Sequence, residues 1–418
     1  MIDIKKLREN PEIFKEGAKR KFVDIDIDKI LYLDNKNREL QAQIDKLKHE
    51  QKKLSLDFSK NKNKDLYEKI KLIKKEIEEK ENEKESISNE LLSLLYLLPN
   101  PPAKDVPDGK TEEENVPIKF WGQIPNFDFE FKDYISLMKE LNLVDLERGA
   151  KVGGFRQYFI KNEAVILELA LLRWSLDFLK EQGFEIFRPT SLVKKFTLYG
   201  TGMFPQGEEE TYKLEEDLYL AGTTEVPLMG YFSDEILEEK DLPIKMAGIS
   251  CAFRKEVGSY GKDVKGIFRV HEFWQTEQVI LHKNDLEETI FWHEKLLENI
   301  EKMMQLLEIP YRVVNVCAGE LSLGQVKRYD LEAWVPSQKR YRETHSDSYL
   351  LDFQTRRLNI RYKDKNGNLH FPYSLNNTAI AVPRILIPLI ENHQQKDGSI
   401  KIPKVLVPYC GFEKIPAD

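Results

Sequence analysis

We predict from the sequence an α+β protein that combines a long N-terminal antiparallel α-helical hairpin with an antiparallel sheet flanked by helices. An apolar repeat with 3-4 spacing runs twice through residues 30–98, which is typical of paired helices. A proline-rich segment follows, and strand-like alternation begins only beyond it. The 418 residues suffice for two or three domains, and we place a boundary between residues 1–104 and 105–418.

The helical hairpin is predicted over about residues 28–98. Its apolar runs extend from Ile30 to Leu54 and from Leu66 to Leu98, and the polar stretch between them is suited to reversing the chain. Each arm of about 30 residues would span roughly 45 Å. Five prolines in residues 99–117 end the second helix, because proline lacks the amide hydrogen that a helix needs.

The larger part is predicted to mix helices and strands. A helix at 163–182 is apolar on nearly every face, which indicates burial on several sides, as at a subunit interface. Asn366-Gly367 between two strand-like runs predicts a type I′ hairpin and hence antiparallel pairing. The other expected elements are strands at 246–254, 267–280, 311–317 and 329–335, and helices at 285–308 and 384–394.

The composition excludes several classes of protein. Three cysteines without a CxxC pair support neither a disulfide framework nor a thiolate zinc site. No apolar run reaches the ~18 residues that span a bilayer, and the N-terminus lacks a signal core, so we expect a cytoplasmic protein without a membrane segment. GxxxxGK[ST], GxGxxG at a strand-to-helix turn and HExxH are all missing, so a glycine-cradled phosphate or a hydrolytic zinc site has no support.

Charge is concentrated at the expected hairpin tip. The chain carries a formal charge of −7, yet between Lys46 and Lys75 eleven lysines stand against four acidic residues. One interpretation is a solvated helix surface with ion pairs one turn apart. The other is contact with the phosphate backbone of RNA or DNA, which needs no base recognition. The lysines that we single out for this contact are Lys52, Lys53, Lys60, Lys62 and Lys64.

Arginine and glutamate pairs on strands are the remaining candidates for chemistry. Arg254 and Glu256 open a glycine-containing loop that returns as a strand carrying Phe273 and Glu277. On composition alone, this pattern is also that of a hairpin with cross-strand ion pairs.

These segments resemble a known family. FRKEVGSYGKDVKGIFRVHEF resembles motif 2 of class II aminoacyl-tRNA synthetases, and GFEIFRPTSLV resembles motif 1. Three further segments are similar to signatures of seryl-tRNA synthetases: DLYLAGTTEVPL, YRETHSDSYLLDFQTRR and YSLNNTAIAVPRILIPLIENHQ. The N-terminal MIDIKKLRENPE and the hairpin are similar to the tRNA-binding arm of that family. The resemblance covers essentially the whole chain and implies a class II synthetase sheet.

The resemblance implies that Arg254, Arg384 and Glu343 carry catalysis by ATP-dependent adenylation. Arg254 would contact the α-phosphate and the serine carboxylate, Arg384 the γ-phosphate, and Phe273 the adenine, whose edge Glu256 and the Val270 backbone would read. The implied ATP-binding set is Arg254, Lys255, Glu256, Val270, Phe273, Glu343, Thr344, His345, Ser346 and Arg384. The implied Mg²⁺ ligands are Glu343 and Ser346, which offer the oxygen atoms that this ion prefers.

For the amino acid, the resemblance implies a site that pairs the ammonium and hydroxyl groups of L-serine. The implied serine-binding set is Thr223, Thr224, Glu225, Arg254, Glu277, Asn376 and Thr378. The sequence departs from the family's common pattern at Gln275, where lysine is usual, and at Tyr349, where asparagine is frequent.

The resemblance therefore implies a homodimeric serine–tRNA ligase that charges tRNA(Ser), and tRNA(Sec) where that tRNA exists. Two alternatives stay open: a class II homologue that charges a small amino acid onto a carrier protein, and a catalytically inactive coiled-coil interaction protein. The arm argues against the first, and the presence of Arg254, Glu343 and Arg384 argues against the second.

Overall fold

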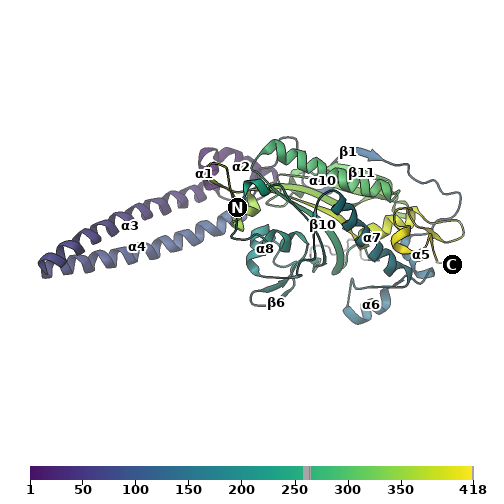
Figure 1. The fold of residues 1–418 in the computed structure, drawn as a ribbon, viewed down its shortest axis with the longest axis horizontal. Helices are drawn as coiled ribbons and strands as arrows, with labels where there is room; N and C mark the ends of the chain where they lie inside the picture. The colour runs from purple at the N-terminus through teal and green to yellow at the C-terminus, as the bar shows by residue number, and fades with distance from the viewer. Residues whose placement is uncertain (258–262, 264, 417–418) are drawn as a thin grey trace. The chain divides into compact units, whose positions relative to one another are not determined.

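The computed structural model describes residues 1–257, 263 and 265–416, and the chain divides into two compact units, residues 1–101 and 102–418. Part of the predicted motif 2 loop, at residues 258–262 and 264, lies outside the described residues. The first unit contains helices only, and the second contains a large sheet with its helices (Figure 1).

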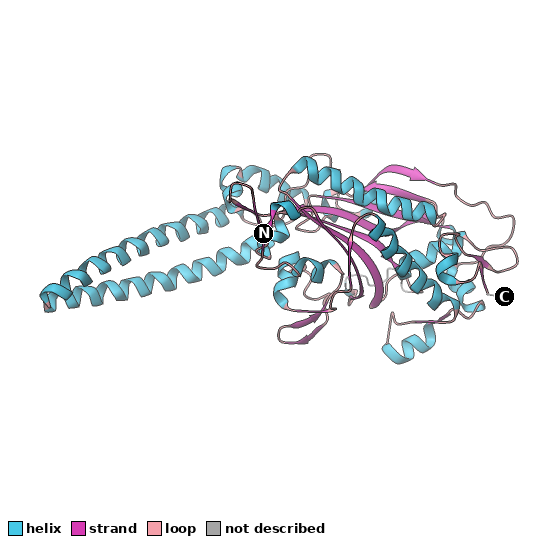
Figure 2. Cartoon of the chain, viewed as in Figure 1, coloured by secondary structure: helices cyan, strands magenta, loops and turns pink. Residues whose placement is uncertain are grey.

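The first unit is built on two long helices that lie side by side (Figure 2). Its helices are α1 (Ile4–Glu9), α2 (Pro11–Arg20), α3 (Ile27–Asn61) and α4 (Lys64–Leu97). Asp26 and Asn63 cap the two long helices by accepting hydrogen bonds from the first-turn amides. The chain reverses through Lys62, which adopts left-handed backbone geometry with φ 42°. The predicted hairpin is confirmed, and its turn is tighter than the polar stretch suggested.

Contacts between α3 and α4 show that the two helices are antiparallel. Ion pairs cross the hairpin at Lys29–Glu90 (2.7 Å), Lys36–Glu83 (2.9 Å) and Lys48–Glu81 (2.7 Å), so residue numbers rise on one helix as they fall on the other. Apolar side chains form a buried seam between the helices. The seam residues are Ile30, Leu33, Leu40 and Ile44 on α3, and Ile77, Ile87, Leu91 and Leu95 on α4.

Polar side chains of α3 and α4 also pair across the hairpin, in one case at the part-buried Asn37. The Ser88 hydroxyl lies 3.1 Å from Asn37 Oδ1, and Lys80 Nζ donates to Gln43 Oε1 over 2.9 Å. In this register of the two helices, each of these four polar groups has a partner across the hairpin.

The second unit is organised around an eight-stranded sheet of order β1-β11-β12-β13-β16-β10-β9-β4. All neighbouring pairs are antiparallel except β4 and β9, which are parallel. The strands are β1 (Val116–Trp121), β4 (Glu185–Phe187), β9 (Ile244–Phe253), β10 (Glu272–His282), β11 (Tyr311–Asn315), β12 (Lys327–Val335), β13 (Arg340–Leu351) and β16 (Tyr373–Ala381).

Three long helices pack on this sheet and form the main core with it: α7 (Glu163–Glu181), α10 (Leu286–Leu306) and α12 (Val382–Asn392). The shorter helices are α5 (Tyr134–Glu140), α6 (Leu146–Gly153), α8 (Lys195–Thr201), α9 (Glu225–Gly230), α11 (Phe353–Arg357) and α13 (Val407–Cys410). Small sheets pair β2 (Val144–Asp145) with β3 (Phe159–Ile160), β17 (Ile400–Lys401) with β18 (Lys414–Ile415), and β5 (Leu192–Val193) with β7 (Leu218–Leu220) and β6 (Lys213–Glu215).

The predicted elements of this unit are largely confirmed, with two corrections. The strand expected from residue 267 begins only at Glu272; before it, the amide of Ile267 donates to the Tyr134 hydroxyl instead of a strand ladder. The Asn366-Gly367 segment does not form a type I′ turn, because Gly367 has positive φ and Asn366 does not.

The hairpin at Asn366-Gly367 has a five-residue loop. The Asp364 carboxylate accepts the amides of Asn366 and Asn368, which stabilises the wider connection. The strands that it joins, β14 (Arg361–Lys363) and β15 (Leu369–His370), are antiparallel as expected but belong to a separate sheet with β8 (Ile236–Glu238).

Helix α7 is buried on most but not all of its faces. Val165, Ile166 and Leu169 are exposed, the last at 57%. Across the part of the chain that the structure describes, we find no helix whose length and apolar character suit it to crossing a membrane.

Candidate active site

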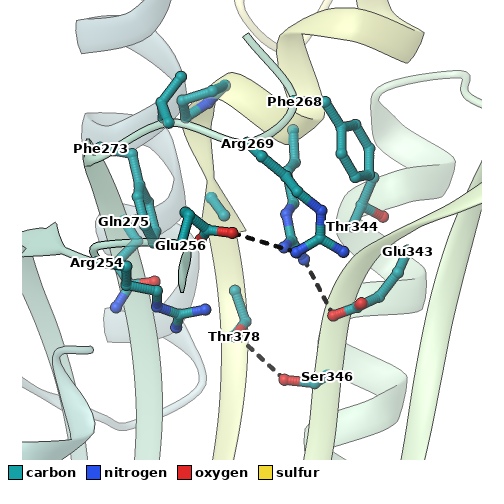
Figure 3. A pocket seen from close by; sticks show the side chains of 14 residues that line it. Arg254, Glu256, Phe268, Arg269, Phe273, Gln275, Glu343, Thr344, Ser346 and Thr378 are labelled. Atoms are coloured by element: carbon teal, nitrogen blue, oxygen red, sulfur yellow. Dashed lines mark hydrogen bonds and ion pairs between the residues drawn. The ribbon is translucent and has the colours of Figure 1, made fainter. Parts of the chain in front are cut away.

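Two adjoining cavities lie at the central strands of the large sheet. The first, the arginine cavity, is lined by Arg254, Glu256, Phe268, Arg269, Val270, Phe273, Gln275, Glu343, Thr344, Ser346, Thr378, Ala381, Pro383 and Arg384 (Figure 3). The second, the threonine cavity, shares Arg254, Glu256, Arg269, Ser346 and Thr378 with it, and adds Thr223, Glu225, Glu277 and Asn376 among others. Five residues thus line both cavities, so ligands in the two cavities would share contacts with them.

Strand order explains this gathering. Arg254 follows β9, Phe273 lies on β10, Thr378 on β16 and Ser346 on β13, and these four strands are neighbours in the sheet. Glu277 and Thr378 are register partners across β10 and β16. Side chains that are more than 100 residues apart in the chain thus line one face of the sheet.

Arg384 enters the arginine cavity from the first turn of α12. Its Nη1 donates to Glu343 Oε1 over 3.0 Å, and its guanidinium lies 5.3 Å from the centre of the Phe268 ring. Burial acts to raise the pKa of Glu343, but nearby guanidinium groups, led by that of Arg384, outweigh burial and lower it. Glu343 is therefore ionised at neutral pH.

Arg254 lies where the two cavities meet. Its Nε donates to the carbonyl of Gly222 over 2.8 Å, and its guanidinium lies 5.4 Å from the centre of the Phe273 ring. Burial and the neighbouring Arg384 both lower its pKa from the ordinary arginine value. Since that ordinary value lies so high, the side chain keeps its charge, and a concentration of positive charge faces the cavity.

Two buried carboxylates, those of Glu225 and Glu277, line the threonine cavity. Glu277 Oε2 accepts the Thr223 hydroxyl and the Glu225 amide, both over 2.6 Å, which closes the 223–225 loop onto β10. Burial, followed by the nearby Glu277, raises the pKa of Glu225 to about 7. Burial also raises the pKa of Glu277, against the hydrogen bonds that it accepts. The two neighbouring acidic groups can pair with a cationic group of a ligand, while Arg254 in the same cavity can pair with an anionic group.

The structure brings most of the predicted site residues together, but not all of them. Three line neither cavity: Thr224 is buried against Ser250, Lys255 lies near the ring of Tyr212, and His345 is buried beside Thr344. Burial lowers the pKa of His345 to about 4, so it is neutral. Every other predicted ATP-binding or serine-binding residue lines at least one of the two cavities. The roles assigned to them stay predictions.

Two cavity-lining arginines were not anticipated. Arg269 lines both cavities; its Nη1 donates to Glu256 Oε2 over 3.3 Å, and its Nε lies 3.4 Å from Asp263. Arg328 on β12 lines the threonine cavity and pairs with Asp330 over 2.6 Å. The arginine within FRVHEF was a signal for the first, whereas nothing in the local sequence around the second distinguishes it from a surface residue.

The predicted tRNA-binding lysines belong to the other unit. Lys52, Lys53 and Lys60 lie on α3, Lys62 in the turn and Lys64 at the start of α4, and all five side chains are exposed. Within the described residues, none of the five forms an ion pair, and no group of three or more His, Cys, Asp or Glu side chains is arranged to hold a metal ion.

An antiparallel sheet with arginines over a two-part cavity is the arrangement expected for a class II aminoacyl-tRNA synthetase. Comparison with known proteins agrees with this class. Residues 209–393 match the tRNA synthetase class II core domain (G, H, P, S and T). Residues 1–102 match the seryl-tRNA synthetase N-terminal domain.

Similarity to individual proteins extends over the whole chain. This chain is 42% identical to a serine–tRNA ligase of Deinococcus radiodurans, and the alignment covers 99% of both chains. The seryl-tRNA synthetase of Pyrococcus horikoshii, solved with ATP, superposes with a TM-score of 0.92 at 41% identity and 99% coverage of both chains. A cytoplasmic serine–tRNA ligase of Naegleria fowleri, solved with AMP, gives 0.86 at 32% identity, covering 97% of this chain and 95% of that one. This chain belongs to the seryl-tRNA synthetase family.

Proposed function

We propose that this chain is a serine–tRNA ligase that activates L-serine with ATP, releases pyrophosphate, and transfers the serine to the 3′ end of tRNA(Ser). The observation that carries the proposal is the position of Arg254, which lines both the arginine cavity and the threonine cavity. A nucleotide in the first and an amino acid in the second would meet at its guanidinium.

The arginine cavity supports binding of ATP. Negative charge grows on the α-phosphate and on the departing pyrophosphate as the serine carboxylate attacks, and Arg254 and Arg384 are fixed cations that answer this charge without reorganising. Phe273 offers a ring face for adenine, while Glu256 and the Val270 backbone line the same wall. Arg269 adds a third guanidinium. Catalysis of this kind is positioning and electrostatics, with no protein nucleophile.

The threonine cavity supports binding of serine. Glu225 and Glu277 suit the ammonium group, and Thr378 and Asn376 offer polar atoms for the hydroxyl. Asn376 Nδ2 is buried without a hydrogen-bond partner within the described residues, so it can donate to the substrate. Such a site rejects alanine, because the polar groups would stay buried and unpaired.

Glu343 and Ser346 fit Mg²⁺ as a partner of ATP. Glu343 is ionised, and the Ser346 hydroxyl, 3.4 Å from that of Thr378, lines the same cavity, so both residues offer hard oxygen atoms there. Mg²⁺ is often held by one or two protein groups together with substrate phosphates. When bound, the ion would neutralise phosphate charge.

We propose that the helical hairpin recognises tRNA, as part of a tRNA-binding domain of residues 1–104, and that residues 105–418 form the catalytic domain. Five exposed lysines at its tip support contact with the tRNA backbone, which recognises RNA shape without reading bases. The same contact would serve tRNA(Sec) where that tRNA exists. We also propose a cytoplasmic homodimer, supported by the exposed apolar strip of α7 together with exposed Val152 and Phe155.

Serine-dependent exchange of pyrophosphate into ATP, without tRNA, tests the adenylation step. A panel of serine, threonine, alanine and glycine should give exchange with serine far above the others. Arg254→Ala removes at least two charge-assisted hydrogen bonds of about 1.5–3 kcal/mol each, so exchange should fall roughly 10²- to 10⁴-fold. Exchange without added serine, or exchange that is unchanged in the Arg254→Ala variant, would contradict the proposal. Efficient exchange without charging of tRNA would favour the carrier-protein alternative.

A further inference from the structure

Gln354 lies behind the threonine cavity and contacts one of its carboxylates. It sits on α11, is only 1% exposed, and lines neither cavity itself. Its Nε2 donates to Glu225 Oε1 over 2.8 Å. It also contacts the cavity-lining residue Thr201, but at the backbone carbonyl, so Glu225 is the side chain of the site that Gln354 can orient.

The two carboxylates of the cavity differ in what holds them. Glu277 Oε2 accepts two donors at 2.6 Å, the Thr223 hydroxyl and the Glu225 amide, so that oxygen stabilises the loop. The Glu225 side chain accepts its hydrogen bond from Gln354 at Oε1 and lines the cavity. The orientation of the Glu225 carboxylate therefore depends on the amide of Gln354.

Gln354 is itself fixed in one orientation. Its Nε2 also donates to the Thr201 carbonyl over 3.2 Å, and the Ser374 hydroxyl donates to its Oε1 over 2.9 Å. Reversing the amide would set its oxygen against both the Thr201 carbonyl and the Glu225 carboxylate, which costs two buried hydrogen bonds. Contacts from α8, α9 and β16 thus determine this geometry.

We infer that Gln354, locked by Ser374, is a positioning residue for serine recognition: it turns the Glu225 carboxylate so that one oxygen faces the substrate ammonium. This inference rests on the proposed binding of serine in the threonine cavity. The inference gives a role to a residue of the DFQTRR segment that touches neither substrate. It also explains why this residue is an amide: a carboxylate would repel Glu225, and an ammonium group would compete with serine for Glu225.

The charges around Glu225 agree with this role. Burial and Glu277 on β10 raise its pKa, whereas the Gln354 hydrogen bond and Arg254 after β9 lower it, with the result near 7. Arg357 on α11 donates to the carbonyls of Tyr199 and Phe204. Gln354 therefore favours the ionised form of Glu225, which is the form that pairs with an ammonium group.

The test is Gln354→Met in the full-length enzyme, assayed by serine-dependent pyrophosphate exchange. KM for serine should rise about tenfold or more, from the loss of a hydrogen bond to a charged group, while KM for ATP changes less than twofold. The acid limb of kcat/KM for serine should also move to higher pH, because the donor that lowers the Glu225 pKa is gone. A merely structural role would move neither the pH limb nor the ratio of the two KM values.

The matched control is Gln394→Met. Gln394 is also buried, at 5% exposure, and likewise donates two hydrogen bonds and accepts one, but its partners are the Lys132 backbone and the Glu391 carbonyl. This control should leave KM for serine unchanged. Ser374→Ala, which frees the amide without removing it, should give a smaller rise than Gln354→Met and serves if the latter does not fold.

The inference is overturned if both Gln354→Met and Ser374→Ala leave KM for serine and its pH limb unchanged, or if KM for ATP rises equally. These outcomes differ from failure of the proposed function, which would already appear as wild-type enzyme without serine-dependent exchange.

Discussion

Replacing lysines at the hairpin tip by glutamine tests how the arm contacts RNA. The variant carries Lys52→Gln, Lys60→Gln and Lys64→Gln. These side chains are exposed, and none of them forms an ion pair within the described chain, so each is available to a phosphate group. Glutamine removes the charge but keeps an unbranched polar side chain and a high helix propensity, which limits the disturbance of the helices.

The expected magnitude follows from counterion release. Each lysine-phosphate contact contributes about 0.9 to the slope of log K against log salt, so losing three lowers the slope by up to about 2.7. Between 50 and 200 mM salt, wild-type affinity for tRNA(Ser) should then fall up to roughly forty-fold more than that of the variant. Fluorescence anisotropy with labelled tRNA, titrated at several salt concentrations, measures both slopes.

The chain offers a control with the same change in net charge. Lys29, Lys36 and Lys48 lie on the same hairpin but pair with glutamates of α4 at 2.7–2.9 Å. Replacing these three by glutamine should leave the slope near the wild-type value and change stability little, because solvent screens exposed pairs. Equal slopes for the two variants, or a tip variant with the wild-type slope, would refute the tip contact.

Two further predictions concern the proposed steps separately. Replacing residues 30–97 by a short glycine-serine linker should leave serine-dependent exchange within about twofold and reduce aminoacylation of tRNA(Ser) at least ~100-fold, because the phosphate contacts of the arm are lost; a parallel loss of both activities would contradict the assigned role. With a Glu225 pKa of about 7, the carboxyl is protonated below that pH and ionised above it, so kcat/KM for serine should rise about tenfold from pH 6 to pH 8. Glu225→Gln should lower kcat/KM and flatten this profile; a wild-type profile already flat over the range would show that Glu225 does not pair with the ammonium group.

The hairpin could be predicted because its signal is local. A seam such as Ile30, Leu33, Leu40 and Ile44 repeats along one helix, and the reversal is marked by a polar stretch between two such runs. The partners of its polar positions could not be predicted. Ser88 meets Asn37 only once the register of the two helices is fixed, and no local pattern specifies that register.

The site residues were named from motif resemblance, and the structure decides which of them share a cavity. The neighbours of β10 in the sheet are β9, which precedes it, and β16, which follows it by about 100 residues. The motifs by themselves therefore do not show that residues on these strands lie close together in space. Arg269 could not be assigned to the site for the same reason, because its ion pairs with Glu256 and Asp263 form only in the folded protein. The Asn-Gly turn was assigned wrongly because the Asp364 side chain, rather than the dipeptide, determines that loop.

By itself, then, the sequence determined the helical hairpin, the α+β class and the identities of the residues that carry charge, because periodicity and motif are properties of neighbouring residues. Only the tertiary structure decided that Arg254 lies between two cavities and that Gln354 stands behind Glu225. Residues 225 and 354 meet because α9 and α11 both pack against α8. A contact between residues so far apart in the sequence is fixed by the packing of the whole unit rather than by any segment of it.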